Sequence, residues 1–340
     1  MSTAIVILNW NGEKYLQQFL PILIENTAIP DVEIIVADNA STDSSLAILK
    51  NEFPTIRTIA LDENYGFAGG YNKALEQVDT DYYVLLNSDV EVTQGWLQPL
   101  VVYLNDHEEV AACQPKIRAY NQRTHFEHAG AAGGFIDRFG FPFCRGRVIG
   151  FAEEDKGQYD SIIDIFWATG ACLMVRSKIY WKVGGLDDDF FAHMEEIDLC
   201  WRFKSRGYRV VCVPESTVYH IGGGTLDMEN PHKTYLNFRN NLLLLYKNLP
   251  TKLLKKTMFW RFLFDYAAAF QLFATGKPAN AKSIFKARKD FKRMQPDFEE
   301  KRKENILYST NDSQSDILQK SIVFGYYLKG KKTYNSLVDK

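Results

Sequence analysis

A run of strand-forming residues early in the chain ends abruptly in three short polar side chains. The sequence at 82–86 is Tyr-Tyr-Val-Leu-Leu, and Asn87, Ser88 and Asp89 follow it directly. Ligands bind outside the carboxyl ends of the strands in an open α/β sheet, so an acid at this point faces a binding site. Asp89 could hold a hard divalent cation together with the phosphates of a substrate. The plain alternative is that Asp89 only caps a turn.

A second acid, Asp38, follows a predicted strand at 33–37. It could accept a hydrogen bond from a nucleobase imide or a ribose hydroxyl, and two acids at corresponding strand ends favour a functional site over two caps. The glycine-rich turn at 64–70 (NYGFAGG) would let the backbone approach a bound group closely. Its glycines do not fit the dinucleotide fingerprint GxGxxG, and the chain has no GxxxxGK[ST] phosphate loop.

A third group of acids opens a predicted helix at 195–207. Glu195, Glu196 and Asp198 fall in its first turn, where acids ordinarily complement the helix dipole. The spacing of Glu195, Asp198 and Arg202 predicts a ladder of ion pairs on one face. Glu196 then points about 100° away from Glu195. An ionised carboxylate at a helix N-terminus suits a general base.

One histidine stands at the end of a predicted strand. His220 belongs to the segment at 217–221, and the glycines at 222–224 predict a flexible hinge after it. A lone histidine is more often structural than a ligand, so spacing alone leaves both roles of His220 open.

The elements that must position these residues alternate along the chain. Strands are expected at 4–8, 33–37, 56–61 and 82–92, with helices between them, and further strands at 110–117, 170–176, 208–213 and 217–221. This alternation predicts βαβ units and a mostly parallel, doubly wound α/β sheet flanked by helices. The loops after its strands hold Asn9, Asp38, Asp89 and the turn at 64–72. The irregular stretch at 119–165 is too long for an idle loop and indicates a substrate-facing excursion.

The composition and charge of the chain limit the kinds of partner that we expect. The chain has 340 residues, 46% of them hydrophobic, and a net charge of −2, so nothing suggests nucleic-acid binding. Residues 248–294 contain eleven Lys and Arg against Asp265 and Asp290, which is +9 (11 − 2) and leaves −11 for the remainder. Helices expected at 234–248, 252–274 and 279–294 mix these cations with aromatic residues. They predict either a helical cap on the main domain or peripheral contact with an anionic membrane through 248–294. The polar tail after about residue 295 is expected to be loosely ordered.

Cysteine usage and hydropathy indicate a cytoplasmic protein. The five scattered cysteines, Cys113, Cys144, Cys172, Cys200 and Cys212, form no CxxC pair and are expected to be reduced and mostly buried. The N-terminus has no basic n-region, and we find no run of about 18 uncharged apolar residues that could span a membrane. The expected location is the cytoplasm, with possible peripheral binding at the inner face of the cytoplasmic membrane.

Four stretches of the sequence, taken in order, carry a family resemblance. They are VILNWNG (6–12), VADNASTDSS (36–45), NYGFAGGYN (64–72) with LLNSDVEV (85–92), and GGLDDDFFAHMEEIDLCWRFKSRGYRVVCVPESTVYHIGGGT (184–225). With these motifs the chain resembles the family 2 glycosyltransferases of GT-A fold, close to their bacterial rhamnosyl- and galactofuranosyl-transferase-like branch, over about residues 4–245.

The resemblance implies a domain plan. Residues 1–229 would form the GT-A catalytic domain, with a nucleotide-sugar-binding half at 1–118 and an acceptor and catalytic half at 119–229. A C-terminal basic aromatic helical extension at 230–295 and a polar tail at 296–340 would follow.

The resemblance also implies a role for each site residue. Donor-binding residues would be Asn9, Asp38, Asn39, Asn64, Gly66, Asn72, Asn87 and Ser88. Asp89 and His220 would hold Mg²⁺ or Mn²⁺, with Asn87 in place of the first Asp of the DXD-type element. Glu196 matches the second acid of the catalytic pair and would be the base, with Asp198 as the fallback.

The implied reaction is transfer of a sugar, with inversion, from a UDP- or dTDP-linked donor. The acceptor would be a hydroxyl of a saccharide or lipid-linked saccharide in cell-surface polysaccharide synthesis. Two alternatives are a nucleotidyltransferase that forms nucleotide sugars and a non-catalytic nucleotide-sugar-binding partner. The first normally has a Gly-rich loop with Arg after strand one, where this chain has Asn-Trp-Asn-Gly at 9–12.

Overall fold

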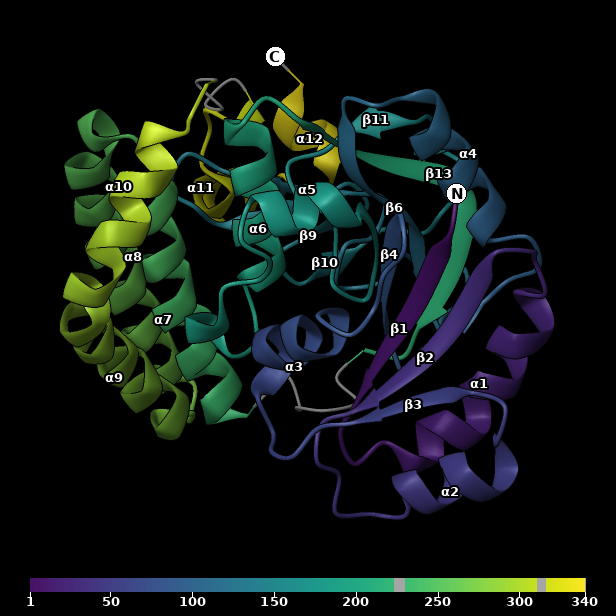
Figure 1. Ribbon diagram of the computed structural model, residues 1–340. Helices are drawn as coiled ribbons and strands as arrows, with labels where there is room; N and C mark the ends of the chain where they lie inside the picture. The colour runs from purple at the N-terminus through teal and green to yellow at the C-terminus, as the bar shows by residue number, and fades with distance from the viewer. Residues whose placement is uncertain (223–229, 311–315, 340) are drawn as a thin grey trace.

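The computed structural model of the chain describes residues 1–222, 230–310 and 316–339. Its first part consists of β1 (Thr3–Asn9), α1 (Glu13–Asn26), β2 (Val32–Asp38), α2 (Ser45–Glu52), β3 (Arg57–Ala60), α3 (Gly66–Leu75), β4 (Tyr82–Asn87), β5 (Val90–Val92) and α4 (Leu97–Asp106). Figure 1 shows the strands as a twisted central layer, with α1 and α2 on one side of the molecule and the C-terminal helices on the other.

Strands β3, β2, β1 and β4 lie side by side in this order and pair in parallel. Their near-continuous apolar runs are typical of strands that are covered on both faces. The register places Asn9 opposite Asp38, and Leu8 opposite Asn87. The polar strand ends therefore form one row along the carboxyl edge of the sheet, and the expected mostly parallel α/β architecture is confirmed.

The second part of the chain completes the sheet and adds a smaller one. It consists of β6 (Val110–Ala119), β7 (Gly134–Ile136), β8 (Pro142–Cys144), β9 (Arg147–Val148), β10 (Phe151–Ala152), β11 (Ile163–Asp164), β12 (Cys172–Arg176), α5 (Ser177–Lys182), the 3₁₀ turn η1 (Asp188–Phe190), α6 (Glu195–Ser205) and β13 (Arg209–His220). β12 lies antiparallel between β4 and β6, and β13 runs parallel to β6.

Two details of this part differ from the sequence expectations. The strands expected at 208–213 and 217–221 are one strand, β13, with an irregular register between Val213 and Thr217. Pro214 lies in this interval and has no N–H to donate to a ladder. The stretch at 119–165 contains the small antiparallel sheet β10-β9-β8-β7, whose strands have two or three residues. Strands that short leave no readable alternation of polar and apolar residues.

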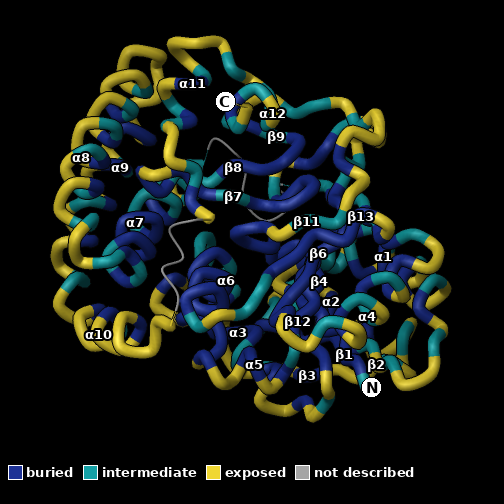
Figure 2. The backbone as a smooth tube through the Cα atoms, turned by 90° about the horizontal axis from the view of Figure 1, so that it is seen from above, coloured by how far each residue is buried: buried dark blue, intermediate teal, exposed yellow. Residues whose placement is uncertain are grey.

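Hydrophobic residues fill both sides of the central sheet. One buried cluster joins β1 and β4 to α1 and α4, and the other joins the opposite face to α3, α6 and α7. The five cysteines are all buried and unbridged. Figure 2 shows the central strands as buried tube, with exposed residues on the outer turns of the surrounding helices.

The C-terminal part is helical. It consists of α7 (Pro231–Asn248), α8 (Thr251–Ala274), α9 (Pro278–Met294), the 3₁₀ turn η2 (Gln295–Phe298), α10 (Glu299–Leu307), α11 (Ile322–Lys329) and α12 (Tyr334–Val338). Asn230 caps α7 by accepting a hydrogen bond from the His232 amide at 2.8 Å, and Pro231 occupies the first helical position. The expectation of a loosely ordered tail was wrong. Ile322 and Leu337 of the tail are buried against the small sheet.

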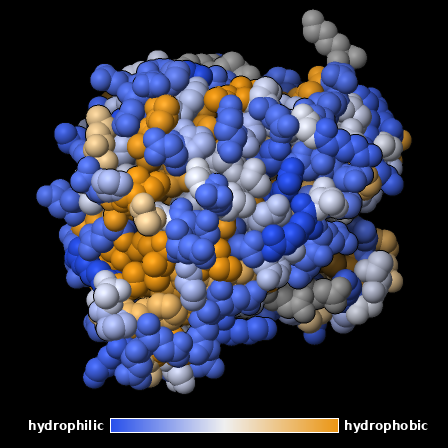
Figure 3. Space-filling model, turned by 90° about the vertical axis from the view of Figure 1, so that its right-hand side faces the viewer, coloured by the Kyte–Doolittle hydropathy of each residue, from blue (hydrophilic) through white to orange (hydrophobic). Residues whose placement is uncertain are grey.

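Two sequence expectations concern flexibility and membrane spanning. The hinge expected at 222–224 falls mostly outside the described residues, since only Gly222 belongs to them. Among the described helices, none combines the length and the apolar character that crossing a membrane requires. The face shown in Figure 3, on the side of α1 and α2, is largely hydrophilic, with hydrophobic residues in several places, most of them in the left half of the view.

Candidate active site

The row of strand ends at the carboxyl edge is held together by its own side chains. Asn9 donates from Nδ2 to Asp38 Oδ2 at 2.9 Å, and the Ser41 amide donates to Asp38 Oδ1 at 2.9 Å. Asp38 is fully buried. Ser88 lies nearby, with its Oγ 3.5 Å from the position that a Cβ at Gly12 would take. In this conformation Asp38 anchors the loop after β2.

Asp89 and His220 meet at the next position along this edge. β5 begins directly after Asp89 and pairs with the end of β13, with Val90 opposite His220. His220 Nε2 thereby lies 3.1 Å from Asp89 Oδ1 and 3.5 Å from Asn87 Nδ2. The structure thus brings together the two residues expected to hold a metal, although they are 131 positions apart.

A second carboxylate, Glu127, lies on the other side of the His220 ring. Its Oε2 lies 3.4 Å from His220 Nδ1, and its backbone amide donates to the Ile117 carbonyl at the end of β6. All three side chains, Asp89, Glu127 and His220, are buried. A carboxylate on the second nitrogen of a metal-ligating histidine orients the ring and raises its basicity. Sequence reasoning missed Glu127 because it lies in the stretch at 119–165, where no motif marks it.

The three groups shift one another's pKa values. Burial alone would lower the pKa of His220, but the charges of Asp89 and Glu127 outweigh it and raise that pKa to about 10. Burial opposes ionisation of Asp89, yet the attraction of His220 holds the pKa of this carboxyl below its usual value. The same balance lowers the pKa of Glu127. Two carboxylates around one imidazole therefore make a net negative site that attracts a cation.

The donor set fits a divalent cation that keeps open positions. Within the described residues no group of three or more His, Cys, Asp or Glu side chains converges to hold a metal. Asp89 Oδ1 and His220 Nε2 lie 3.1 Å apart, and a metal held by both atoms would replace the proton that they share. Mg²⁺ sites in proteins often use one or two carboxylates and complete the shell with water and substrate phosphates. This pair therefore suits a metal that is bound together with a diphosphate.

The glycine-rich turn after β3 is built by amide side chains. Asn39 donates from Nδ2 to Asn64 Oδ1 at 3.0 Å and to the Gly66 carbonyl at 2.9 Å, and its Oδ1 accepts from the Tyr65 amide at 3.1 Å. Gly66 has φ +71°, and a Cβ there would lie 2.4 Å from the Phe191 ring. Asn39, Asn64 and Gly66 thus shape the turn that begins α3. Their hydrogen bonds fix its backbone next to the Asp38 loop.

Asn72, expected to bind the donor, is engaged elsewhere. Its Nδ2 donates to the Leu186 carbonyl at 2.8 Å and to Asp188 Oδ1 at 2.6 Å. Its Oδ1 accepts from the Tyr180 hydroxyl at 2.6 Å and from the Leu186 amide at 3.1 Å. Both ends of the amide are thus occupied by protein groups. We correct the expectation: Asn72 fastens the loop that leads to α6.

The acidic helix α6 begins after a strained turn. Phe191, His193 and Met194 have φ values of 64°, 72° and 76°, which side chains other than glycine rarely adopt. The Phe191 carbonyl accepts from the amides of Phe67 at 2.6 Å and Ala68 at 3.2 Å, so the turn lies against the start of α3. Strain of this kind persists only where the surroundings enforce it, and it often marks a functional site.

One asparagine of α7 enforces the turn. Asn240 is fully buried, and its Nδ2 lies within hydrogen-bonding distance of three carbonyls of the turn, those of Phe190 at 2.9 Å, Ala192 at 2.8 Å and His193 at 2.7 Å. The sequence offers no signal for this contact, because an asparagine inside a predicted helix usually faces solvent. The C-terminal helices therefore help to set the position at which α6 begins.

Glu195 and Glu196 are the first residues of α6. Burial raises the pKa of Glu196 to about 7. Burial, followed by the charge of Glu196, raises the pKa of Glu195 well above its usual value. Within the described part of the chain, one oxygen of each carboxyl is buried without a hydrogen-bond partner. The expected ion-pair ladder is therefore incomplete, since Glu195 takes no part in it.

Glu196 lies close to the Asn87 strand end. Its Cβ is 4.0 Å from the position that a Cβ at Gly170 would take. The next residue, Ala171, accepts a hydrogen bond from the Asn87 amide at 3.0 Å. A short path through neighbouring residues therefore links Glu196 to the edge where Asp89 lies.

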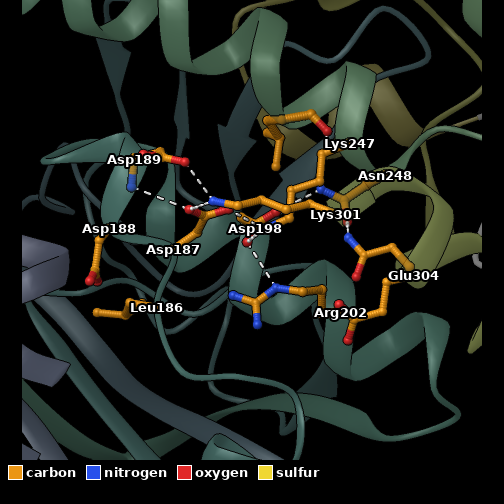
Figure 4. A network of polar contacts seen from close by, with 12 residues as sticks. Leu186, Asp187, Asp188, Asp189, Asp198, Arg202, Lys247, Asn248, Lys301 and Glu304 are labelled. Carbon is orange, nitrogen blue, oxygen red and sulfur yellow. Dashed lines mark hydrogen bonds and ion pairs between the residues drawn. The ribbon is translucent and has the colours of Figure 1, made fainter. Parts of the chain in front are cut away.

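Asp198 lies in a buried network of charges (Figure 4). Its Oδ2 accepts from Arg202 Nε at 2.8 Å and from Lys247 Nζ at 2.8 Å, and its Oδ1 accepts from Asn248 Nδ2 at 2.8 Å. Asp198 is fully buried, and although burial opposes ionisation, Lys247 and Arg202 hold its pKa below the usual value. An acid with both oxygens occupied and no access to substrate cannot serve as the base. We correct the fallback assignment of Asp198.

A hollow elsewhere on the molecule is separate from this site. It has a volume of about 1060 Å³ and lies at the amino ends of β1 and β4, between Ser2, Asp81 and Trp181. The polar strand ends described above lie at the opposite edge of the sheet, so the hollow does not belong to the site.

The fold defines the class of protein. The chain superposes with a TM-score of 0.53 on the mannosyltransferase PcManGT from Pyrobaculum calidifontis, solved with GDP-Man and Mn²⁺, at 14% identity over 90% of this chain and 85% of that chain. It superposes with a TM-score of 0.52 on S. aureus TarS 1-349, solved with UDP-GlcNAc in one form, at 15% identity over 91% of this chain and 89% of that chain. At these identities the likeness defines the fold, which is that of the GT-A glycosyltransferases.

A family match then identifies the chain. The profile described as Glycosyl transferase family 2 matches residues 4–184, and the chain belongs to that family. The N-acetylglucosaminyl-diphospho-decaprenol L-rhamnosyltransferase of Mycobacterium tuberculosis (strain CDC 1551 / Oshkosh) is 26% identical over 64% of this chain and 75% of its own length. The rhamnosyltransferase WbbL of Escherichia coli (strain K12) is 24% identical over 64% of this chain and 82% of its own length. The resemblance drawn from the four sequence stretches is thus confirmed, and the protein is a glycosyltransferase.

Proposed function

We propose that this glycosyltransferase moves a sugar from a UDP- or dTDP-linked donor to a hydroxyl group, with inversion at the anomeric carbon. The observation that carries the proposal is the geometry of the carboxyl edge. Asp89 and His220 lie 3.1 Å apart beside Asn87. Glu196, with one buried and unpartnered oxygen among the described residues, lies close to the same strand end.

Glu196 is the proposed base. It takes the proton of the acceptor hydroxyl, and the oxygen attacks the anomeric carbon from the face opposite the diphosphate. The new C–O bond forms as the bond to the diphosphate breaks, so one displacement inverts the configuration. A pKa of about 7 leaves a large fraction of Glu196 ionised near neutral pH while keeping it basic enough to accept the proton.

The leaving diphosphate would lie against Asn87, Ser88 and Asp89. Mg²⁺ or Mn²⁺, when held by Asp89 and His220, supplies positive charge beside the departing diphosphate. The residues that anchor the nucleoside side are Asn9, Asp38 and the turn built by Asn39, Asn64 and Gly66, which together form the floor of the donor half.

A saccharide or a lipid-linked saccharide is the proposed acceptor, in the synthesis of a cell-surface polysaccharide. Support comes from the relative in Mycobacterium tuberculosis, whose name describes a diphospho-decaprenol acceptor. An acceptor of this kind is held in a membrane, so we place the enzyme as a peripheral protein at the inner face of the cytoplasmic membrane.

The test is a panel of UDP-, dTDP- and GDP-sugars with Mn²⁺, in which thermal shift reports binding and slow release of nucleoside diphosphate reports hydrolysis. A true donor should raise the melting temperature and be hydrolysed. Glu196→Gln should lower turnover by roughly 10²- to 10⁴-fold and leave the thermal shift by the donor unchanged.

Glu195→Gln is the matched control. Burial raises the pKa of Glu195 well above its usual value, and the proposal assigns the proton transfer to Glu196 alone, so a neutral amide at position 195 should change turnover little. Turnover of Glu196→Gln at the wild-type rate would show that the base is elsewhere. A donor that binds without any hydrolysis or transfer would favour the non-catalytic nucleotide-sugar-binding alternative.

A further inference from the structure

Helix α8 buries polar residues and exposes aromatic ones. Its buried positions recur every fourth residue and are Thr257, Arg261, Asp265 and Ala269. Its exposed large apolar residues, here called the aromatic stripe, are Phe259, Phe262, Leu263, Tyr266, Phe270 and Phe273, with exposed fractions between 37% and 74%. Surface helices of soluble domains show the opposite pattern, with the apolar face toward the core.

The buried charged side chains of α8 have partners in their present positions. Arg261 pairs with Asp265 at 3.1 Å, and Arg288 of α9 reaches the other oxygen of Asp265 at 2.5 Å. The Arg261 guanidinium also lies over the Phe141 ring, 4.3 Å from its centre. Turning the helix to hide its aromatic residues would pull this ion-pair cluster apart. The aromatic stripe is therefore held outward by the interior of the protein.

The aromatic stripe occupies one narrow arc. At 100° per residue its six members fall within about 100° of the helix circumference. Lys255 and Lys252 fall in the same arc about one and two turns before Phe259, and Lys256 lies at its border. In this fully described helix the only acid is Asp265, which is buried and paired. The outward face thus presents lysines followed by aromatic residues, with no negative charge.

The neighbouring helix α9 extends this surface. The Phe285 ring of α9, 49% exposed, lies 5.4 Å from the Tyr266 ring. The exposed cations of α9 are Lys282, Lys286, Lys289, Lys292 and Arg293. A contiguous apolar patch with a basic border results.

We propose that the aromatic stripe is a membrane-binding surface, on which α8 lies in the plane of an anionic lipid bilayer. Interfacial helices bury an aromatic and aliphatic face at the level of the headgroups while their Lys and Arg side chains attract anionic lipid. Protein interfaces are also rich in aromatic residues, but they are depleted of lysine, which borders this patch on two helices. The inference deepens the proposed function, since a lipid-linked acceptor lies in such a bilayer.

The test is co-sedimentation of the full chain with vesicles. We expect binding to vesicles of phosphatidylcholine mixed with phosphatidylglycerol and much weaker binding to phosphatidylcholine alone. The triple variant Phe259→Ser/Phe270→Ser/Phe273→Ser should bind the mixed vesicles at least roughly tenfold more weakly. The control is Leu46→Ser/Val102→Ser, which removes two exposed apolar residues (41% and 44%) from α2 and α4, away from α8 (Figure 1), and should bind as the wild type does.

Equal vesicle binding by the triple variant and the wild type would overturn the inference, and so would no binding by the wild type. Self-association of the wild type that the triple variant loses would also overturn it, because the aromatic stripe would then be an interface between copies of the chain. Hydrolysis of the donor in the absence of vesicles is measured in parallel. The triple variant should retain it, because the stripe is remote from the row of strand ends. If neither the wild type nor the variants hydrolyse the donor, although the wild type binds vesicles as expected, the proposed function is contradicted. The proposed membrane-binding surface is then still supported.

Discussion

The position of Glu196 at the start of a buried helix changes the pKa of its carboxyl group. The same carboxyl on an exposed surface would titrate near its ordinary value, whereas burial raises the pKa of Glu196 to about 7. Burial, followed by the charge of Glu196, raises the pKa of its neighbour Glu195 well above the usual value. Two adjacent residues of one type thus have differently shifted pKa values because their surroundings differ.

This difference predicts a pH dependence of the transfer reaction. A base must be ionised to accept a proton, so kcat/KM should rise about tenfold per pH unit below about pH 7 and level off above it. The measurement is the initial rate of donor hydrolysis or transfer across the pH range in which the protein stays folded. Donor affinity at each pH, from the thermal shift, serves as the control. A flat profile between about pH 6 and 8 would exclude Glu196 as the titrating base.

Asn240 is predicted to act on the reaction through the turn that precedes α6. Asn240→Leu removes the donor that holds the carbonyls of Ala192 and His193, while the Phe190 carbonyl keeps the Ala192 amide and Arg239 as donors. The strained turn should therefore relax and displace Glu196. We expect kcat to fall roughly 10- to 100-fold, with little change in donor affinity. The apparent pKa of the pH profile should also shift, which a purely structural residue would not cause.

The control for Asn240 lies one turn earlier in the same helix. Among the described residues, the Asn237 side chain donates to the Lys233 carbonyl within α7, at 2.9 Å, and to no group of the turn, so Asn237→Leu should leave kcat unchanged. If Asn240→Leu lowers the melting temperature but not kcat, then Asn240 serves stability alone.

At the scale of elements, α6 and α7 are joined by a buried charge network. Lys247 of α7 is 4% exposed and bonds Asp187 at 2.6 Å and Asp198 at 2.8 Å. Lys301 of α10 reaches the same Asp187 at 2.5 Å. The network therefore ties the loop before α6, α6 itself and two C-terminal helices into one unit. The position of the proposed base depends on helices that lie beyond the family match.

Removing the central cation of this network should cost more than removing a surface one. Lys247→Met would leave two buried carboxylates short of a partner, and we expect a loss of about 3–5 kcal/mol in the free energy of unfolding. Urea unfolding followed by circular dichroism measures it. Lys303→Met, which breaks exposed ion pairs with Glu299 and Glu300 on α10, should leave stability nearly unchanged. Similar stability of the two variants would mean that the network contributes little.

The row of strand ends could be predicted from the sequence, because it follows from a general rule of α/β sheets. Asn9, Asp38 and Asn87 each end a readable apolar run, and parallel strands bring such ends to one edge. The pairing of Asp89 with His220 was anticipated only through the family resemblance. Spacing along the chain says nothing about a contact across 131 positions.

Other contacts could not be predicted, because the partner of a polar side chain is decided by packing. Asn72 follows the glycine-rich turn and looks like a donor ligand, yet the loop before α6 occupies both ends of its amide. Glu127 lies among strands of two or three residues that have no periodic pattern. Asp198 is not distinguished in sequence from its acidic neighbours, and its contacts with Arg202, Lys247 and Asn248 are what exclude it as the base.

At the scale of the whole molecule, the end of the chain completes the core of the small sheet. Ile322 and Leu337 are each 1% exposed and pack with Phe143 and Val148. The Ile322 amide donates to Asp137 at 3.0 Å, and the Tyr334 amide donates to Glu153 at 3.1 Å. A segment that looks like a polar tail in sequence thus closes the part of the protein that carries the stretch at 119–165.

Truncation after Lys320 should therefore destabilise the protein. Loss of two buried aliphatic side chains removes about 3–6 kcal/mol of hydrophobic stabilisation and uncovers Phe143 and Val148. The melting temperature should fall, and the binding of a hydrophobic dye should rise. A chain truncated after Val338 is the control, since it keeps both buried side chains and should melt close to the full chain. Equal melting temperatures for the two truncated chains would mean that the small sheet is stable without α11 and α12. The packing of these helices would then serve another purpose, such as placing Phe324 beside α8.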